Sequence, residues 1–145
     1  FFDPVVKSCD LPYAKAASIE DVFKLSDIVT MHMPLMDSTR KMITEKYLRL
    51  MKKTAILINA ARGGIVNEDD LFTCLKEGVI RGAGFDVFAN EPLQKDSRLL
   101  ILENIVLTPH LGASTDEAQF RVGEMAVNQI REFFVNNKLL NEVKA

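Results

Sequence analysis

Four short apolar runs constrain the fold of this chain more than any other feature of its sequence. They span residues 28–31, 55–58, 80–85 and 105–107, and each has the length of a β-strand. They recur roughly every 20 to 30 residues, which is the spacing of β-α-β units. Because strands that alternate with helices form parallel sheets, we predict an α/β fold, a doubly wound parallel sheet with helices on both faces.

The segments between these strands carry signals for helix starts and ends. Asp21 stands three residues after Ser18, as in a capping box. We expect helices that run to about residues 25, 51, 78 and 136, capped by Ser18, Thr44, Asn67, and Ser114 or Thr115. Residues 115–136 would then form a long C-terminal helix. We also expect Phe1–Phe2 to be the tail of a strand and residues 87–103 to form a loop.

Composition excludes several classes of protein. The chain has 145 residues, enough for one domain with a substantial core, and 48% of them are hydrophobic and 26% charged. A formal net charge of −2 does not indicate the basic surface that binds nucleic acid. No apolar stretch approaches the roughly 18 residues of a membrane span. Cys9 and Cys74 lack the spacing of a metal site, so we expect no metal, reduced thiols and a cytoplasmic protein.

Polar residues follow three of the predicted strands. Arg62 and Gly63-Gly64 come after residues 55–58, while Glu91 and His110 follow the next two strands. Ligands of parallel sheets bind at the carboxyl ends of strands. An Arg can hold a carboxylate there with two parallel hydrogen bonds, and glycine lets backbone approach closely. Each residue also has a plainer interpretation: Arg62 in a salt-bridged loop, Glu91 in a surface turn, and His110 packed at a strand end.

Three motifs carry these residues, and together they resemble one family. The motifs are Asn59-Ala60-Ala61-Arg62-Gly63-Gly64-Ile65-Val66, the segment 82–92 with its two acids, and Thr108-Pro109-His110-Leu111-Gly112-Ala113-Ser114-Thr115. From Asp3 to about Asn141 the chain resembles the cofactor-binding domain of the D-isomer-specific 2-hydroxyacid dehydrogenases. The form of residues 110–115 is most similar to the D-3-phosphoglycerate dehydrogenase branch of that family. The resemblance implies a Rossmann-like fold.

The resemblance implies a catalytic role for each strand-end residue. His110 would be the general acid/base, because a proton donor works best with a pKa near the working pH. Glu91 would hydrogen-bond the far ring nitrogen of His110, which orients the ring and favours the protonated imidazole. Arg62 would bind the substrate carboxylate and polarise the keto oxygen, in a bidentate geometry that Lys does not reproduce.

The resemblance also implies NAD as the cofactor. Asp86 would hold the nicotinamide carboxamide, although it can also be an Asp that caps the loop after its strand. Asp3 would accept hydrogen bonds from the adenosine ribose and repel a 2′-phosphate, which favours NAD over NADP. Lys7 lies close enough to weaken that preference, and Asp3 with Pro4 can also be ordinary turn chemistry. The full expected set of cofactor contacts is Asp3, Pro34, Ala60, Ala61, Asp86, Gly112 and Ala113.

The glycines of the chain do not have the spacing of a dinucleotide-binding loop. That fingerprint places Gly-x-Gly-x-x-Gly about 20 residues before its acid, and Asp3 has only two residues before it. We therefore interpret residues 1–145 as a partial NAD-binding domain that lacks the first strand-helix unit, the Gly-rich loop and the separate substrate domain. We expect this piece alone to be inactive, to bind NADH poorly and to self-associate through an uncovered strand edge.

The leading functional hypothesis is an oxidoreductase that transfers a hydride between NAD(H) and a D-2-hydroxy acid/2-keto acid pair. The favoured pair is 3-phosphoglycerate and 3-phosphohydroxypyruvate, of serine biosynthesis. A glycerate, glyoxylate or lactate dehydrogenase, or an NAD(H)-sensing corepressor related to the family, stays open because function lies in the site and not in the fold. The resemblance implies a homodimer or homotetramer formed through the cofactor domain, with small-molecule substrates and no nucleic acid or membrane partner.

Overall fold

A computed structural model describes residues 1–142, which fall into two units. The first unit is Phe1–Pro109 and the second begins at His110. The first unit contains the sheet and the second contains one long helix. Each unit is described by itself.

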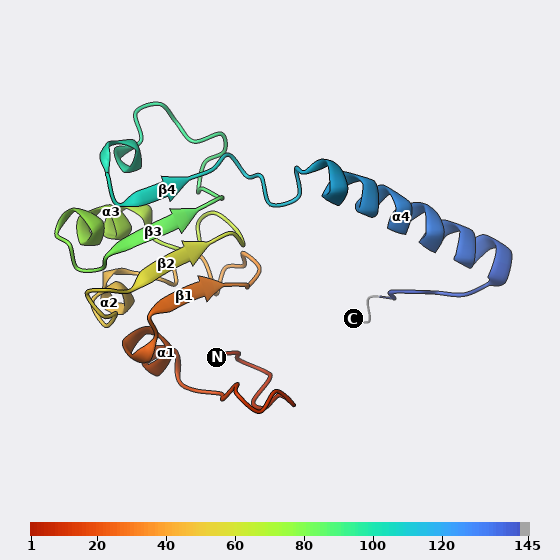
Figure 1. The fold of residues 1–145 in the computed structure, drawn as a ribbon, viewed down its shortest axis with the longest axis horizontal. Helices are drawn as coiled ribbons and strands as arrows, with labels where there is room; N and C mark the ends of the chain where they lie inside the picture. The colour runs from red at the N-terminus through yellow and green to blue at the C-terminus, as the bar shows by residue number, and fades with distance from the viewer. Residues whose placement is uncertain (143–145) are drawn as a thin grey trace. The chain divides into compact units, whose positions relative to one another are not determined.

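The sheet of the first unit has four parallel strands, which confirms the predicted α/β class (Figure 1). Its strands are β1 (Ile28–Met31), β2 (Ile56–Asn59), β3 (Gly82–Phe85) and β4 (Ile105–Leu107), and they lie in the order β1-β2-β3-β4. Two strands differ from their predicted ranges. β2 begins and ends one residue later than expected, and β3 begins two residues later. The carboxyl ends of all four strands therefore meet at one edge of the sheet.

One prediction at the N-terminus is wrong. Phe1–Phe2 is not in a strand. The Phe1 ammonium donates to the carbonyl of Lys15 at 2.7 Å, and the Phe1 carbonyl accepts from the Ala17 amide at 2.9 Å. Phe1 is therefore bonded to residues 15 and 17 and not to a strand, and β1 is an edge strand of the described sheet.

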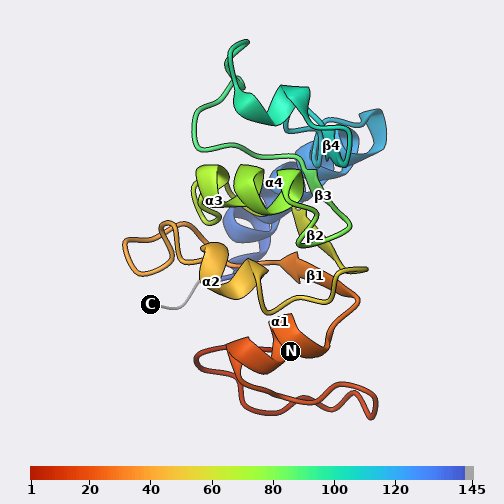
Figure 2. The same cartoon turned by 90° about the vertical axis from the view of Figure 1, so that its left-hand side faces the viewer.

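One face of the sheet is buried under helices. Val29, Leu57 and Ala83 lie side by side in register, and all three are buried. The helices α1 (Ile19–Leu25), α2 (Glu45–Leu48) and α3 (Glu68–Lys76) supply the other half of this core through Phe23, Leu48, Leu71, Phe72, Cys74 and Leu75. Figure 2 shows α2 and α3 along one side of the strands.

The opposite face of the sheet is largely open in the first unit. Ile28 is 62% exposed and Val106 is 68% exposed, and both point away from the buried face by the alternation of each strand. Within residues 1–109 the helices cover the sheet on one face, where the sequence predicts cover on both. Ile56 and Ile58 on this open face are half-buried.

The predicted caps hold for α1 and α3. The Ser18 hydroxyl accepts from the Asp21 amide at 3.1 Å, which is the N-cap bond of a capping box, and it donates to the Asp21 carboxylate at 2.7 Å. Asn67 accepts from the Asp69 amide at 3.2 Å. Gly78 follows α3 with φ +65°, the left-handed conformation that ends helices.

The expected helix after Thr44 is shorter than predicted. Only Glu45–Leu48 is α-helical, and Thr44 makes no side-chain capping bond. The first amide of the helix, of Glu45, donates to the Asp70 carboxylate of α3 at 2.9 Å. The start of α2 is thus held by a tertiary contact and not by a side-chain cap.

The second unit is dominated by α4 (Asp116–Asn136). Thr115 caps it by accepting from the Ala118 amide at 3.1 Å, and Asn137 ends it with φ +48°. This confirms a long C-terminal helix over the predicted range. In the part of the chain that the structure describes, no helix is long and apolar enough to cross a membrane.

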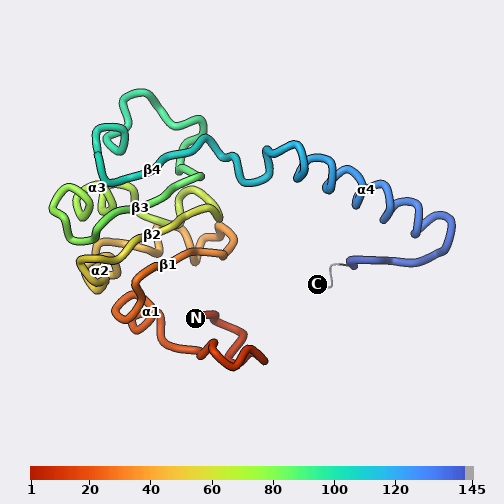
Figure 3. The backbone as a smooth tube through the Cα atoms, in the orientation of Figure 1, coloured from red at the N-terminus to blue at the C-terminus, as the bar shows by residue number. Residues whose placement is uncertain are grey.

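The predicted loop after β3 contains one short helix. Figure 3 traces this segment as an irregular arc that leaves the end of β3 and returns before β4. Its later part forms a 3-10 helix, η1 (Arg98–Ile101), and Leu99 of η1 is buried in the core. The first part of the arc contains Glu91 and lies beside the end of the sheet.

Candidate active site at the strand carboxyl ends

Asn59 organises the loop that carries Arg62. Its side chain is 1% exposed, at the last position of β2. The Asn59 Oδ1 accepts from the Ala61 amide at 3.2 Å, and its Nδ2 donates to the Arg62 carbonyl at 3.0 Å. These two bonds close a tight turn directly after the strand. The turn fixes the direction in which the chain presents the next side chains.

Arg62 itself is exposed at the tip of this turn. Its Nη1 donates to the carbonyl of Ala61 at 2.7 Å. Within residues 1–142 it forms no ion pair with an acid, so the interpretation as a salt-bridged loop residue is not what the structure shows. The guanidinium has five N–H donors, and a bidentate carboxylate ligand needs two of them.

Asp86 is tied to both neighbouring strands. Its amide donates to the Asn59 carbonyl at 2.9 Å, and its Oδ1 accepts from the Thr108 hydroxyl at 2.5 Å. Thr108 directly follows β4, and its own amide donates to the Phe85 carbonyl at 2.9 Å. The half-buried Asp86 carboxylate therefore has a fixed place at the edge where β2, β3 and β4 end.

Glu91 lies in a turn that its own side chain closes. The Glu91 Oε1 accepts from the Phe88 amide at 2.9 Å. The next amide, of Ala89, donates to Oε1 of Glu68 at 2.6 Å. Two consecutive amides of this turn are thus held by two carboxylates. Phe88 connects the turn to the hydrophobic core, because its side chain is buried there.

The loop of Arg62 and the turn of Glu91 are in direct backbone contact at Gly63. A Cβ atom on Gly63 would lie 1.7 Å from the Phe88 carbonyl oxygen and 2.1 Å from its carbonyl carbon. Any residue other than glycine would force the two segments apart. The structure therefore brings the segment after β2, with Arg62, and the segment after β3, with Asp86 and Glu91, to one edge. Contacts of Asn59, Gly63 and Thr108 join these segments to each other and to the end of β4.

His110, Gly112 and Ala113 belong to the second unit, so their position relative to this edge stays a prediction. All three are exposed. His110 has φ +57°, a conformation in which non-glycine residues are uncommon. The Ala113 carbonyl accepts from Gln119 Nε2 at 2.6 Å, which connects this loop to the first turns of α4.

Asp3 has a turn role in the structure. Its Oδ1 accepts from the amides of Val5 and Val6, both at 2.8 Å. These backbone hydrogen bonds, Val6 first and then Val5, lower the pKa of the Asp3 carboxyl, with a smaller contribution from nearby Lys7. The plainer interpretation of Asp3 is therefore observed, and its ribose contact stays a prediction.

The remaining expected cofactor contacts are small or exposed groups. Ala60 and Pro34 are exposed and Ala61 is half-buried. The Pro34 carbonyl accepts from the Thr39 hydroxyl at 2.7 Å. Small side chains leave room for a flat ring system, and the anchored carboxylate of Asp86 can accept hydrogen bonds from a carboxamide. This donor and acceptor set fits the nicotinamide half of a dinucleotide.

Three residues that organise the site have no role in the sequence-based prediction. They are Asn59, Glu68 and Thr108. Asn59 carries a signal, since a polar residue that ends an apolar strand must find partners if it is buried. Thr108 stands two residues before His110, but nothing in the sequence around it indicates that its hydroxyl binds Asp86. Nothing in the local sequence around Glu68 indicates that it reaches a backbone amide 21 positions away.

Four parallel strands, with polar and small residues gathered at their carboxyl edge, define an α/β protein of the nucleotide-binding class. Comparison with known proteins makes this specific: residues 2–112 match the family model described as "D-isomer specific 2-hydroxyacid dehydrogenase, NAD binding domain". The chain belongs to this family. Among the described residues, no group of three or more His, Cys, Asp or Glu could hold a metal ion.

Relatives within the family carry several different names. A D-3-phosphoglycerate dehydrogenase of Methanocaldococcus jannaschii is 47% identical over 114 residues, which cover 79% of this chain and 22% of the relative. A glyoxylate reductase of Korarchaeum cryptofilum is 45% identical over 115 residues, covering 79% of this chain and 35% of the relative. A glycerate dehydrogenase of Methylorubrum extorquens is 42% identical over 137 residues, covering 92% and 43%.

Solved structures agree with the fold. The NAD-complexed form of a D-isomer specific 2-hydroxyacid dehydrogenase from Lactobacillus delbrueckii ssp. bulgaricus matches with a TM-score of 0.83 and 28% identity. The match covers 99% of this chain and 47% of that one. The chain thus spans less than half the length of each of these relatives.

Proposed function

We propose that the full-length protein is an NAD-dependent D-2-hydroxyacid dehydrogenase with 3-phosphoglycerate and 3-phosphohydroxypyruvate as its substrate pair, and that it acts in serine biosynthesis. The observation that carries the proposal is the backbone contact of Gly63 with Phe88, which joins the Arg62 loop to the Glu91 turn. A cationic carboxylate binder and a carboxylate that can orient a histidine then share one strand edge.

The proposed chemistry is the reduction of a 2-keto acid. Bound NADH supplies the hydride. Arg62 binds the substrate carboxylate and stabilises charge that develops on the keto oxygen. His110 donates the proton to that oxygen, and Glu91 orients the imidazole and favours its protonated form. The reverse reaction uses the same groups in the opposite sense, with His110 as the base.

The proposed cofactor contacts follow the family pattern. Asp86 holds the carboxamide and Asp3 the adenosine ribose, so NAD is preferred to NADP. Small groups line the rest of the cofactor surface, namely Pro34, Ala60, Ala61, Gly112 and Ala113. The described chain is interpreted as a partial NAD-binding domain, to be completed by a Gly-rich loop and a substrate domain in the full-length protein.

The assembly and compartment are part of the same proposal. We infer a homodimer or homotetramer formed through the cofactor domain, in the cytoplasm, with small-molecule partners. The exposed Ile28 and Val106 on the open sheet face support association, since exposed apolar surface can mark interaction sites. The free, buried Cys74 is consistent with a reducing compartment.

A second substrate class is favoured by a specific observation. Relatives of nearly equal identity, 45% against 47%, carry the name glyoxylate reductase instead of D-3-phosphoglycerate dehydrogenase. Glyoxylate or hydroxypyruvate is therefore the alternative substrate of the same reaction. The residues at this edge bind the carboxylate and the reacting carbon, which all these acids share.

The experiment is NADH oxidation by the full-length protein with 3-phosphohydroxypyruvate, hydroxypyruvate, glyoxylate and pyruvate. We expect the highest kcat/KM with 3-phosphohydroxypyruvate, and losses of about 100-fold or more in Arg62→Ala and His110→Ala. Arg62→Lys should recover little, because it loses the bidentate geometry. Faster turnover of glyoxylate would replace the substrate assignment. NADH binding without turnover of any acid would reject the enzyme and favour an NAD(H)-sensing regulator.

A further inference from the structure

We propose that Glu68 is a positioning residue that holds the turn carrying Glu91 in place. The inference rests on the proposed function, because it assigns the purpose of this contact to the orientation of Glu91. Glu68 belongs to α3 and is 23 positions away from Glu91 in sequence. The contact between the two segments therefore depends on the fold.

The geometry places two glutamates on two neighbouring amides. The Ala89 amide donates to Glu68 Oε1 at 2.6 Å, and the Phe88 amide donates to Glu91 Oε1 at 2.9 Å. Hydrogen bonds to an ionised carboxylate are shorter and roughly twice as strong as those between neutral groups. Because the two amides are consecutive, moving one moves the other. Glu68 thus holds the amide next to the one that Glu91 binds.

Glu68 is fixed to the core of the first unit. It is the first residue of α3, whose N-terminus is capped by Asn67. The same helix buries Leu71 and Leu75 completely or almost completely. The turn at residues 89–92, in contrast, is exposed. The Glu68 carboxylate therefore connects a rigid helix to an exposed segment.

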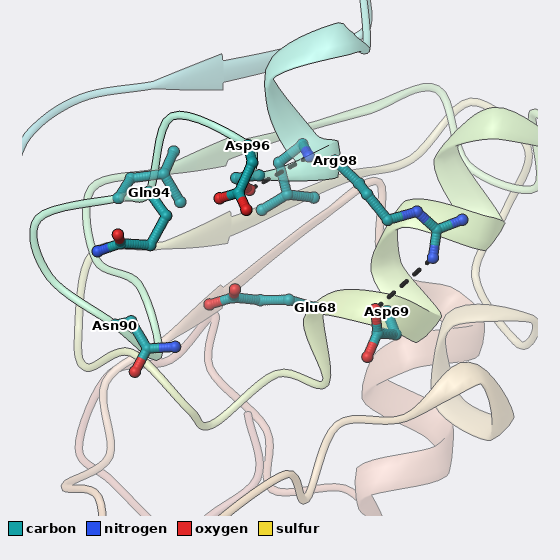
Figure 4. Close-up of a pocket in the computed structure, with 9 residues that line it drawn as sticks. Glu68, Asp69, Asn90, Gln94, Asp96 and Arg98 are labelled. Carbon is teal, nitrogen blue, oxygen red and sulfur yellow. Dashed lines mark hydrogen bonds and ion pairs between the residues drawn. The ribbon is translucent and has the colours of Figure 1, made fainter.

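An open pocket beside the turn shows why this connection matters. Its volume is about 270 Å³, and Glu68, Asn90, Leu93 and Gln94 are among the residues that line it. Figure 4 shows Glu68 extending from the start of α3 toward the loop that carries Asn90. On the side of the turn that faces the pocket, open space takes the place of packed side chains. The contact of the turn with α3 on that side is the hydrogen bond from the Ala89 amide to Glu68.

The adjacent acid offers a matched comparison. Asp69 lines the same pocket and carries the same charge, but its side chain is 81% exposed and lies 3.7 Å from Arg98. Figure 4 shows Asp69 directed toward Arg98. The Asp69 side chain therefore contacts a side chain and not the turn. Removing it changes the local charge and leaves the Ala89 amide bonded to Glu68.

The consequence for catalysis follows from the role proposed for Glu91. A carboxylate that accepts from one ring nitrogen of a histidine orients the imidazole. Keto-acid reduction requires His110 to donate a proton to the keto oxygen. When the turn is no longer held, Glu91 spends less time in place, and His110 is oriented for proton transfer in a smaller fraction of the molecules. The turnover number for reduction then falls, while the binding of NADH does not change.

The test compares Glu68→Ala, Glu68→Gln and Asp69→Ala in the full-length protein. For Glu68→Ala we expect kcat for reduction to fall roughly tenfold, with little change in KM for NADH. Glu68→Gln keeps an acceptor oxygen and should recover most of the activity. Asp69→Ala should match the wild type. Thermal melting of each variant verifies that it is folded.

Two results would overturn the proposal. One is a wild-type kcat in Glu68→Ala, and the other is an equal loss in Asp69→Ala, which would make the effect one of charge alone. A protein that turns over no keto acid would reject the proposed function, and hydrogen exchange then decides the positioning role separately. Faster exchange of the Phe88 and Ala89 amides in Glu68→Ala supports it, and unchanged exchange rejects it.

Discussion

The Thr108 hydroxyl donates a 2.5 Å hydrogen bond to Oδ1 of Asp86, joining the end of β4 to the end of β3. Asp86 is also held through its amide by the Asn59 carbonyl at the end of β2. Three strand ends thus meet at Asp86, whose carboxylate receives the nicotinamide carboxamide in the proposed function. The orientation of this carboxylate is set by a neighbour that makes no proposed contact with a ligand.

Thr108→Val removes the hydroxyl and nearly preserves the shape of the side chain. We expect the Kd for NADH to rise roughly tenfold, since a hydrogen bond to a charged group contributes about 1.5 kcal/mol. Fluorescence titration of the full-length protein measures this. Thr73→Val is the control, because the Thr73 hydroxyl bonds the Asp69 carbonyl within α3. Equal Kd values for Thr108→Val and the wild type would show that Thr108 does not position Asp86.

Gly63→Ala is expected to separate the Arg62 loop from the Glu91 turn. The new Cβ would stand 1.7 Å from the Phe88 carbonyl oxygen, so one backbone must move. A displacement of about 1 Å in a positioned group can cost roughly 100-fold in rate, and we expect kcat/KM to fall at least that far. The melting temperature should fall as well.

Gly123→Ala is the matched control for this substitution. Gly123 lies inside α4, and nothing stands within 4 Å of its added Cβ. Alanine there should stabilise the helix by about 0.5–1 kcal/mol, because glycine is a poor helix former. If Gly63→Ala retained wild-type kcat/KM, the contact between the two loops would have no part in catalysis.

Asn59→Ala tests the turn that presents Arg62. It removes an acceptor for the Ala61 amide and a donor for the Arg62 carbonyl, both at a position that is 1% exposed. Leaving such groups unpaired costs about 1–3 kcal/mol of unfolding free energy. KM for the keto acid should rise, because the loop no longer holds Arg62 in one position for binding the substrate carboxylate. Urea unfolding and steady-state kinetics give both quantities.

Asn136→Ala provides the comparison for Asn59→Ala. Asn136 is an exposed residue at the end of α4 that bonds Glu132 within the same helix. Surface changes of this kind stay within about 0.5 kcal/mol. Equal stability losses at the two asparagines would show that the Asn59 turn contributes nothing specific.

The parts of the fold that depend on neighbours in sequence could be predicted. Strand positions follow from short apolar runs, and the caps at Ser18, Asn67 and Thr115 follow from one side chain and an amide two or three residues away. The same rule wrongly predicted a side-chain cap by Thr44, which makes no such bond. Asp70 of another helix binds the first amide of that helix, of Glu45, and the local sequence does not indicate this tertiary contact.

The candidate site divides along the same line. Arg62, Asp86 and Glu91 could be placed at one edge, because parallel strands end on one side of a sheet. The contacts that hold them could not, since Gly63 to Phe88 and Glu68 to Ala89 join segments more than 20 positions apart. Such contacts depend on loop conformations that strand periodicity does not determine.

Because of Cys74, we expect the free energy of unfolding to depend on pH in the alkaline range. Its side chain has no exposed surface. Burial, more than any nearby charge, raises the pKa of this thiol from 9.0 to about 11, and the carboxylates of Glu45 and Glu77 add to the effect while Arg49 opposes it. The folded state thus keeps a proton that the unfolded state releases above pH 9. Native protein should react with a thiol reagent at Cys9, which is exposed, and not at Cys74.

The sign of the resulting pH dependence follows from proton binding. Between pH 9 and about 11 the folded state binds more protons at Cys74 than the unfolded state, so the free energy of unfolding falls as pH rises. Two pKa units correspond to about 3 kcal/mol at most. Other groups titrate here too, so the slope of Cys74→Ala is subtracted from that of the wild type, with Cys9→Ser as control. We expect Cys74→Ala to flatten the decline and Cys9→Ser to leave it unchanged; equal slopes in all three would show that the Cys74 thiol ionises as easily folded as unfolded.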